Sequence, residues 1–400
     1  MKLVHLSDTH LGYRGQGIEK MVDDPWRPGV PIRQREADLM LGLIRAIDRI
    51  LEQPHPDVVL HSGNLFDTAR PTAHLLDFAM TQLRRLTEVG IPVVIVEGNH
   101  SSPRDRSHGH ALRLLAHLPR VQVICHGAQR VQVGAILLHA FPHRALLEGF
   151  LPDRSELDLR CHNVLVAHGV ADGLPFYKTG RPAVDVHVTN YATWYEYIAL
   201  GHCHLFAQVP GTTTAFYAGA TAMVTSGDFR PGHVFSFNRV IFDGPAVTVE
   251  REELETRPMH AYGLDDASKL SPAEVLAYLE RQVTAVPPHG AYCQVVVEQL
   301  DPLARRSLSA RAVEELFPSA AGLTVSLRAR EQHWDAVRTS LLEGGDAVAR
   351  FRQLVAQMDG DATFRAAVDA LGTDLLARAA AKVAEADATT GGKDWEVESA

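Results

Sequence analysis

The sequence has few of the features that mark membrane or extracellular proteins. Its four cysteines stand far apart and include no CxxC pair, which indicates reduced thiols in a cytosolic protein and not a disulfide framework. No apolar run approaches the roughly 18 residues of a membrane-spanning helix. The opening "MKLVHLSDTH" enters a strand pattern directly and does not read as a signal peptide. We therefore expect a cytoplasmic protein without a membrane segment. The cysteines are Cys125, Cys161, Cys203 and Cys293.

An excess of positive charge is also lacking. Lys and Arg number 39 against 48 Asp and Glu, which gives a net charge of −9. The chain as a whole therefore offers no basic footprint for nucleic acid or membrane. A local basic groove or bound cations can still favour DNA, so the charge leaves that partner open. The apolar content of 46% and the length of 400 residues are typical of a globular protein with two or three domains.

Short apolar runs alternate with helical patterns over residues 1–240. Residues 35–53 and 73–90 have apolar side chains at helical spacing, and Gly90 ends the second pattern. This alternation predicts a layered α/β domain with helices on both faces of a sheet. Residues 121–140 and 215–224 look more like hairpins, so we expect a mixed sheet. The predicted buried strands are "KLVHLS", "DVVLHS", "PVVIVE", "AILLHA", "NVLVAH" and "YIALGH".

A smaller unit is expected to follow the α/β domain. Ser271 and Glu274 form a capping-box pattern before a helix, and "AYCQVVVEQL" and "GLTVSLRAR" read as strands. Two apolar stripes later in the chain predict amphipathic helices, which pack on their own protein or dock on a partner. The last residues are polar and rich in glycine, which predicts disorder. The predicted parts are an α/β domain over 1–255, a small α+β domain over 256–332, a helical region over 333–385 and a tail over 386–400.

Side chains that bind metals recur where the predicted strands end. Because the carboxyl ends of such strands converge on one crevice, these side chains should meet. In the DxH and HxH pairs, residues two apart point the same way along extended chain, whereas Thr9 and Cys203 turn aside. Imidazoles with carboxylate and amide oxygens suit Mn²⁺, with Zn²⁺ or Fe²⁺ as alternatives. The side chains are Asp8, His10, Asn64, Asp67, Asn99, His100, His168, His202 and His204.

Each of these signals also has a plain structural explanation. The chain has 21 histidines, so an isolated DxH or HxH is more often solvated than bound to metal. Gly-Asn-His is a good turn sequence by itself, since Gly and Asn tolerate left-handed backbone geometry. Five such elements in order, each after a strand, favour a shared metal site.

The motif set DxH, G-(D/N)-xx-D, GNH, a single His and GHxH resembles that of the calcineurin-like metallophosphoesterases. More narrowly, "LSDTHLG", "GNLFDTARP" and "FYAGATAM" resemble the SbcD-type nuclease subunit of the bacterial SbcC–SbcD complex, which is homologous to the Mre–Rad complex. The resemblance spans nearly the whole chain. It implies a four-layer α/β metallophosphoesterase sandwich, a small α+β capping domain that binds DNA, and C-terminal helices that dock on a coiled-coil ATPase.

The resemblance also implies roles for individual residues. Water activated by two metal ions would attack a DNA phosphodiester in line. His100 would protonate or stabilise the leaving oxygen, and Asp67 would support its loop. The ions would be Mn²⁺, with Mg²⁺, Zn²⁺ or Fe²⁺ as alternatives. The implied ligands are Asp8, His10 and His204 for one ion, Asn99, His168 and His202 for the other, and Asn64 as the bridge.

Two positions depart from the family pattern. Ser101 follows the GNH motif where the family commonly has aspartate, and Asn64 stands at the bridging position. An amide has one neutral oxygen and an NH₂ that only donates, so an Asn64 that turned its oxygen to one ion would turn its NH₂ to the other. We expect the Asp8 half-site to retain metal better and the Asn99 half-site to fill only partially. Replacement of a natural aspartate, a weakly active natural variant and a natural non-catalytic subunit all remain open.

DNA and a protein partner are both expected. Basic and aromatic residues that follow the metal motifs are candidates for phosphate contacts, although a single surface arginine is more often only solvated. Residues 345–384 are predicted to dock on an SbcC/Rad-type ATPase, and a homodimer is expected. The hypothesis is a Mn²⁺-dependent exonuclease or endonuclease acting at DNA ends or hairpins. The alternatives are a small-molecule phosphodiesterase and a non-catalytic DNA-binding subunit. The candidate DNA contacts are Tyr13, Arg14, Arg70, Arg104 and Arg106.

Overall fold

The computed structural model describes most of the chain as two compact units, residues 1–328 and 329–400. All six predicted strands form, and both predicted helices of the α/β domain are present. The described residues are 1–15, 17–52, 54–103, 109–171, 185–244, 246–330, 347–358 and 361–390.

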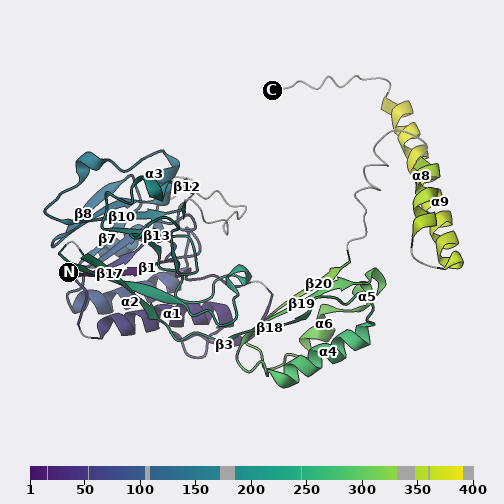
Figure 1. Ribbon diagram of the computed structural model, residues 1–400, viewed down its shortest axis with the longest axis horizontal. Coiled ribbons are helices and arrows are strands. Elements are labelled where there is room, and N and C mark those ends of the chain that lie inside the picture. Colours follow the sequence, from purple (N-terminus) through teal and green to yellow (C-terminus); the bar gives the residue numbers. More distant parts are fainter. Residues whose placement is uncertain are drawn as a thin grey trace. The chain divides into compact units, whose positions relative to one another are not determined.

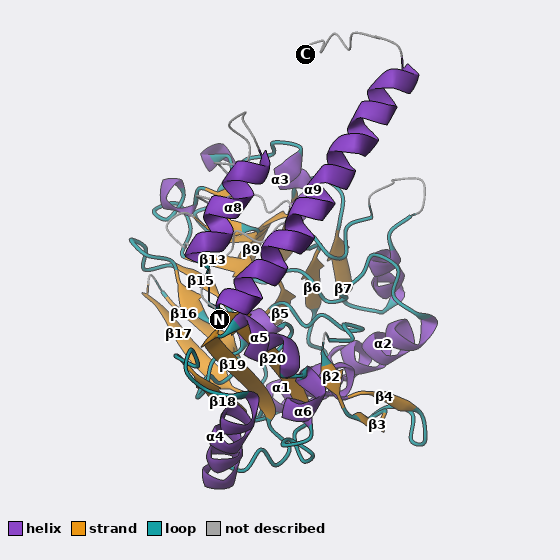
Figure 2. Ribbon diagram, turned by 90° about the vertical axis from the view of Figure 1, so that its right-hand side faces the viewer, coloured by secondary structure: helices purple, strands orange, loops and turns teal. Residues whose placement is uncertain are grey.

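The first sheet has the strand order β17-β16-β1-β5-β6-β7. Its strands β1, β5, β6 and β7 are parallel, while β16 runs antiparallel to β1 and to β17. Figure 2 shows β5, β6 and β7 side by side. The bounds are β1 Lys2–Leu6, β5 Val58–His61, β6 Val93–Val96, β7 Val121–Ile124, β16 Ser236–Asp243 and β17 Ala246–Glu253.

The second sheet has the order β14-β15-β13-β10-β9-β8 and is mixed, as predicted. Strands β9, β10, β13 and β15 are parallel, and β8 and β14 pair antiparallel at the two edges. A two-stranded sheet of β11 and β12 follows β10 in the chain. The bounds are β8 Gln129–Val133, β9 Ile136–Phe141, β10 His162–His168, β11 Val170–Ala171, β12 Asp185–Val186, β13 Tyr197–Gly201, β14 Ala207–Gln208 and β15 Ala215–Tyr217.

The two predicted hairpins were placed incorrectly. Within residues 121–140, β7 belongs to the first sheet, and only β8 and β9 form a hairpin in the second. Within residues 215–224, only β15 is a strand, and it pairs with the preceding β14. The apolar pattern identified the strands correctly, but it does not indicate which sheet each strand joins.

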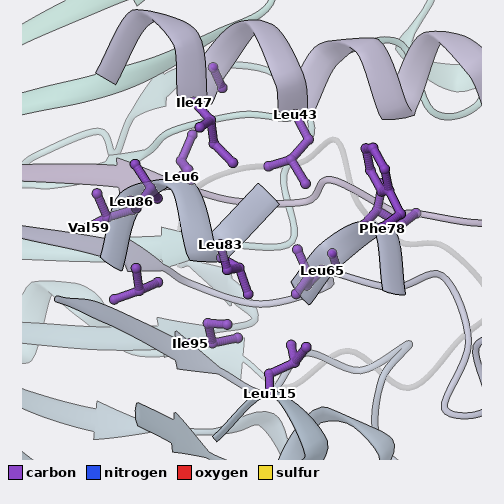
Figure 3. Close-up of a cluster of buried hydrophobic side chains, with 14 of the residues drawn as sticks. Leu6, Leu43, Ile47, Val59, Leu65, Phe78, Leu83, Leu86, Ile95 and Leu115 are labelled. Atoms are coloured by element: carbon purple, nitrogen blue, oxygen red, sulfur yellow. The ribbon is translucent and has the colours of Figure 1, made fainter. Parts of the chain in front are cut away.

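The two sheets stack between helical layers, which confirms the predicted four-layer class. Helices α1 (Gln34–Leu51) and α2 (Ala73–Glu88) cover one face of the first sheet, and the second sheet covers the other (Figure 1). Val59 points toward the helices, while Val58 and Leu60 point toward the second sheet, because side chains alternate along a strand. Helices therefore lie on one face of the first sheet and not on both. Figure 3 shows the packing beneath α1 and α2.

The small α+β domain, which belongs to the first unit, has its own sheet, in the order β18-β19-β20-β2, and its own core. Its helix α4 begins after Ser271, whose side chain forms the predicted capping box with Glu274. Strand β2, far away in sequence, pairs with β20, so the larger domain lends a strand to the smaller sheet. The bounds are β2 Ile18–Glu19, β18 Met259–Leu264, α4 Pro272–Ala285, β19 Tyr292–Leu300, α5 Pro302–Ser307, α6 Ala310–Glu314 and β20 Gly322–Ala329.

Two helices make up the described part of the second unit. Helices α8 (Ala347–Gln357) and α9 (Ala362–Thr390) pack side by side (Figure 2). Residues 386–390 belong to α9, so the prediction of a disordered tail from 386 is wrong for these five positions. Alanine and glutamate are strong helix formers, and "EADATT" continues the alanine-rich helix. Residues 391–400 lie outside the described part of the chain.

Among the remaining short elements of the described fold are a hairpin and a short helix. Strands β3 (Met21–Asp23) and β4 (Pro31–Arg33) form a hairpin that leads into α1. Helix α3 (His143–Leu147) contributes Leu146 to the apolar cluster on the outer face of the second sheet. None of the described helices combines the length and the apolar character needed to cross a membrane. The four cysteines, all of them within the described residues, form no disulfide bond.

Candidate metal centre

The predicted ligands meet where strands of the two sheets end. Asp8 and His10 follow β1, Asn64 follows β5, Asn99 follows β6, and His168 is the last residue of β10. His202 and His204 follow β13. A chain of close contacts joins all seven side chains, and Asp8, Asn64 and His168 are buried. The structure therefore brings together every residue that the sequence assigned to metal binding.

The backbone at the centre adopts uncommon conformations. Asp8, His10, Asn64 and His202 have φ angles of 50°, 47°, 57° and 106°, in the region that favours glycine. Each such residue costs about 1–3 kcal/mol of folding free energy, and such residues cluster at functional sites. Gly98 has no side chain to obstruct the site, and a Cβ atom there would overlap the Asn64 amide. The loops are thus shaped to bring these side chains together.

The first half-site consists of Asp8, His10 and His204. Nδ1 of His10 donates to Asp67 at 2.9 Å, and Nδ1 of His204 donates to Asp228 at 2.8 Å. The two Nε2 atoms face each other at 3.2 Å, so one of them carries a proton when no cation lies between them. Asp8 Oδ1 lies 3.6 Å from His10 Nε2. With that proton removed, the two nitrogens and the Asp8 oxygen would form a set of acceptors that fits a cation.

The electrostatics of this half-site favour positive charge. Burial lowers the pKa of His10, but hydrogen bonds to Asp67 and Asp8 outweigh it and raise that pKa to about 9. Burial raises the pKa of Asp8, but His10, His168 and His204 outweigh it and hold that pKa well below its usual range. Asp8 is therefore ionised at neutral pH, which suits its predicted role as an oxygen ligand.

The second half-site consists of Asn99, His168 and His202. Nδ1 of His168 donates to the Ser62 carbonyl at 2.9 Å, so its bare Nε2 faces the Asn99 oxygen at 3.0 Å. Burial holds the pKa of His168 well below its usual range and lowers that of His202 to about 4. Both rings are neutral at pH 7 and can bind a metal ion. The three predicted ligands nevertheless carry no charge, in contrast to the half-site that contains Asp8.

Asn64 lies between the two half-sites, with its amide held in one orientation. Its oxygen accepts the backbone N–H of His100 at 3.0 Å. Its NH₂ donates to Asp8 Oδ1 at 3.1 Å and to Asn99 Oδ1 at 3.0 Å. The reverse orientation would set NH₂ against N–H and oxygen against a carboxylate. The amide nitrogen of Asn64 thus faces both half-sites. The orientation expected from the sequence had the amide oxygen facing one half-site and the nitrogen facing the other.

His100 lies beside the centre and is oriented by Asp67. Its Nδ1 is 3.0 Å from Asp67 Oδ1, the same oxygen that accepts from His10. The His100 side chain is 19% exposed, compared with 1% for His10. Ser101 donates to the Phe66 carbonyl at 3.2 Å and does not contact this pair in any described hydrogen bond. Asp67 therefore holds a predicted ligand and the predicted catalytic histidine together, which is more than loop support.

Several supporting residues were missed by the sequence analysis. Ser7 Oγ donates to Asp8 Oδ2 at 2.5 Å, and the backbone N–H of His202 donates to the same oxygen at 2.8 Å. Asp228, which orients His204, comes from a short 3₁₀ turn with a capping box to Thr225. The "TSGD" pattern is the only local signal for that turn, and it says nothing about which histidine the carboxylate meets.

The candidate DNA contacts are only partly described. Arg14 and Arg70 are exposed, and Tyr13 is half-buried. Arg104 and Arg106 lie outside the described residues.

Arg14 is accompanied by basic residues that the sequence analysis did not select. It lines a hollow of about 430 Å³ together with Arg27, Arg33 and His74. Glu36 also lines this hollow, and its carboxylate lies 3.8 Å from Arg14. Arg27 lies in the loop between β3 and β4, and Arg33 is the last residue of β4, so both belong to a hairpin that the metal motifs do not include. Three arginines and one glutamate are among the ten residues that line the hollow, which is formed by the chain before α1, by α1 itself and by the start of α2.

Comparison with known proteins decides the family. A family model described as calcineurin-like phosphoesterase matches residues 1–225, which is more than half of the chain. The chain belongs to the calcineurin-like phosphoesterase family. The match covers all seven predicted ligands, and the family predicted from the motifs is thereby confirmed.

The relatives of this calcineurin-like phosphoesterase include several proteins named DNA double-strand break repair protein Mre11. The one from Methanococcus maripaludis is 27% identical over 244 residues, 58% of this chain and 59% of that protein. The one from Methanocaldococcus jannaschii is 30% identical over 211 residues, 51% of each chain. The one from Saccharolobus solfataricus is 26% identical over 208 residues, 51% of this chain and 49% of that protein. The chain spans about half the length of these relatives.

Proposed function

We propose that this phosphoesterase is an Mre- or SbcD-type nuclease that hydrolyses DNA phosphodiesters with two divalent metal ions. The observation that carries the proposal is the convergence of atoms that can bind metal in each half-site, two Nε2 atoms in one and an Nε2 atom with an amide oxygen in the other. The His168 nitrogen and the Asn99 oxygen are both acceptors, and such a pair is unfavourable by itself and favourable around a cation. A cation at the first half-site would replace the proton that its raised pKa leaves on His10. The similarity to proteins named for double-strand break repair supports DNA as the substrate.

The donor set fits Mn²⁺, with Mg²⁺, Zn²⁺ and Fe²⁺ as alternatives. Asp8, His10 and His204 would hold one ion, and Asn99, His168 and His202 the other. When bound, the two ions supply Lewis acidity and an activated water for attack on phosphorus. His100, partly exposed and held by Asp67, is placed to give a proton to the leaving oxygen.

We further propose that Asn64 limits this activity. Its NH₂ occupies the place where a bridging carboxylate would offer an oxygen to both ions, and it cannot coordinate metal. The Asp8 half-site keeps an ionised ligand and should bind metal more tightly than the Asn99 half-site. Asn64 also supports a second candidate function, that of a non-catalytic DNA-binding subunit.

The test is Mn²⁺-dependent cleavage of linear duplex and hairpin DNA by the native chain and by Asn64→Asp. We expect Asn64→Asp to cut at least about 10–100-fold faster, because that is the usual cost of losing even an outer partner of a metal ligand. Asn64→Asp combined with His204→Ala is the control for contaminating nuclease and should be inactive. Equal cleavage by both forms would show that Asn64 is a tolerated ligand.

The same assay separates the alternatives. DNA bound by both forms and cut by neither would favour the non-catalytic subunit. Hydrolysis of a nitrophenyl phosphodiester without DNA cleavage would favour a small-molecule phosphodiesterase. Exposed Arg14 and Arg70, with Arg27 and Arg33 beside Arg14, are the proposed phosphate contacts.

We also propose that the helical pair docks on an SbcC/Rad-type ATPase. Apolar side chains of α9 are exposed: Phe364 at 40%, Leu371 at 63% and Leu375 at 56%. These three residues are seven and four positions apart, so they share one face of α9, and an exposed apolar face of this kind fits a groove on a partner. We also propose that the protein forms a homodimer and is located in the cytoplasm.

A further inference from the structure

We propose that Asn64 is a built-in donor that holds the metal centre together when no metal is bound. This inference rests on the proposed function only in taking the centre to be a metal site. The native chain would then be stable without metal, and an ion at the Asn99 half-site would have to displace the amide.

The hydrogen bonds of Asn64 are complete without any cation. Its NH₂ has two hydrogens, and two acceptors lie within reach, Asp8 Oδ1 at 3.1 Å and Asn99 Oδ1 at 3.0 Å. Its oxygen is occupied by the His100 N–H. Asn64 is 1% exposed, so water does not compete for these groups. The amide therefore does in the metal-free centre what a bridging ion does in a loaded one, which is to hold two oxygens near each other.

A carboxylate at the same position would have the opposite effect. Asn64→Asp would place an anionic oxygen about 3 Å from Asp8, which is itself fully buried. A carboxylate has no hydrogen to donate, so both hydrogen bonds that the Asn64 NH₂ makes to Asp8 and Asn99 would become contacts between acceptors unless a cation lay between them. The aspartate form would thus depend on metal for stability, whereas the asparagine form would not.

The surrounding backbone fixes the amide in place. Asn64 has a φ of 57°, which asparagine adopts more readily than most residues. Gly98 lets the neighbouring loop approach the amide closely, since a Cβ there would overlap its oxygen and its backbone nitrogen. The same loop carries His100, whose N–H determines the orientation of the amide. Metal binding must break contacts that the fold is built to make.

The test is thermal unfolding of the full chain in EDTA and in a Mn²⁺ titration, for the native protein and Asn64→Asp. In EDTA we expect Asn64→Asp to melt roughly 5 °C or more below the native protein. Added Mn²⁺ should raise the melting temperature of Asn64→Asp steeply and that of the native protein only slightly, because stabilisation by a ligand follows its affinity for the folded state.

Asn163→Asp is the matched control. Asn163 is also a buried asparagine, 4% exposed, and its NH₂ donates to the carbonyls of Asp158 and Cys161, away from the centre. In EDTA, Asn163→Asp should have a lower melting temperature than the native protein, and added Mn²⁺ should not restore it. If Asn64→Asp unfolds on chelation, counting bound Mn²⁺ by electron paramagnetic resonance gives a second measurement. We expect about one tightly bound ion in the native chain and two in Asn64→Asp.

The proposal is overturned if Asn64→Asp is as stable as the native protein in EDTA. It is also overturned if Mn²⁺ stabilises both forms equally or if the native chain binds two ions tightly. These outcomes are independent of DNA cleavage. Metal-dependent stability of Asn64→Asp without nuclease activity would leave this inference standing and reject the proposed function, whereas cleavage without that stability pattern would do the reverse.

Discussion

At the scale of single residues, one carboxylate oxygen serves two histidines. Asp67 Oδ1 accepts from Nδ1 of His10 and lies 3.0 Å from Nδ1 of His100. Burial raises the pKa of Asp67, but the bonds to both histidines outweigh it and lower that pKa to about 2. Asp67 is therefore charged at neutral pH, and it couples the proposed ligand to the proposed acid.

Asp67→Asn should weaken metal binding by about 10–100-fold, because the charge that holds the His10 ring is lost. Mn²⁺ affinity, measured by titration calorimetry, is the readout. Asp158→Asn, at a partly exposed carboxylate paired with Arg160, is the control and should leave the affinity unchanged. Unchanged affinity in Asp67→Asn would mean that His10 is held by its packing alone.

The convergence of the predicted ligands could be foreseen from the sequence because each lies at or just after the end of a strand, within a short motif. The residues that hold and orient these side chains could not be predicted from the sequence. Asp228 reaches His204 from a turn 24 residues later, a contact set by tertiary packing. The orientation of Asn64 depends on a backbone N–H at His100, and no sequence pattern records which donor claims the amide oxygen.

At the scale of elements, β1 and β5 carry buried histidines beneath the centre. His5 contacts the Tyr197 hydroxyl at 2.9 Å and Ser62 Oγ at 2.8 Å, and its pKa is lowered to about 3, chiefly by burial. Burial also lowers the pKa of His61 to about 4. Both rings are neutral in the folded protein. The sheets are thus joined by polar contacts as well as by their apolar core.

The free energy of unfolding should fall as the pH drops below 6.5. An unfolded histidine binds a proton near pH 6.5, whereas these two stay neutral in the fold to about pH 3 and 4. The unfolded state therefore binds more protons, and each histidine costs up to about 1.4 kcal/mol per pH unit in that window. Denaturant unfolding at pH 7 and pH 5 measures the slope. In His5→Gln, the slope of the free energy of unfolding against pH should fall by the contribution of about one proton. An identical slope in that variant would show that His5 does not stay neutral in the folded protein.

Strand identity could be predicted from the sequence, but sheet membership could not. β7 and β8 are adjacent in the chain and enter different sheets. β2 is only two residues long, and it pairs with β20 about 300 residues later. Local apolar patterns reflect burial on the two faces of a strand, and they do not identify its neighbours.

On the scale of domains, a polar junction ties the small α+β domain to α1. Asp38 accepts from Arg257 at 2.6 Å and from the Tyr292 hydroxyl at 2.8 Å. The guanidinium of Arg35 stacks on the Tyr292 ring at 4.1 Å, and that ring is 3% exposed. Together with the β2–β20 pairing, this junction makes residues 1–328 one compact unit.

Tyr292→Ala should lower the free energy of unfolding by about 3–5 kcal/mol, because it leaves a cavity beneath Arg35. Tyr292→Phe keeps the ring and should cost only about 1–3 kcal/mol, since Asp38 loses one donor and keeps Arg257. Denaturant midpoints with unchanged slopes would measure both. Equal costs for the two variants would show that the hydroxyl, and not the ring, holds the junction.

Removing residues 340–400 should abolish binding to an SbcC-like ATPase and leave residues 1–328 folded, because the two units are separately compact. Co-purification with the partner is the readout, and the melting temperature of the remainder is the control. An unchanged pull-down would place the docking surface elsewhere on the chain.

The side chains that converge at the strand ends are the proposed ligands of two divalent ions. The most direct measurement is anomalous diffraction at the manganese edge from Mn²⁺-soaked crystals of the native chain and of Asn64→Asp. We predict two peaks in Asn64→Asp, one among Asp8, His10 and His204 and one among Asn99, His168 and His202, with the first peak dominant in the native chain. Absence of any peak at these residues in Asn64→Asp would contradict the account.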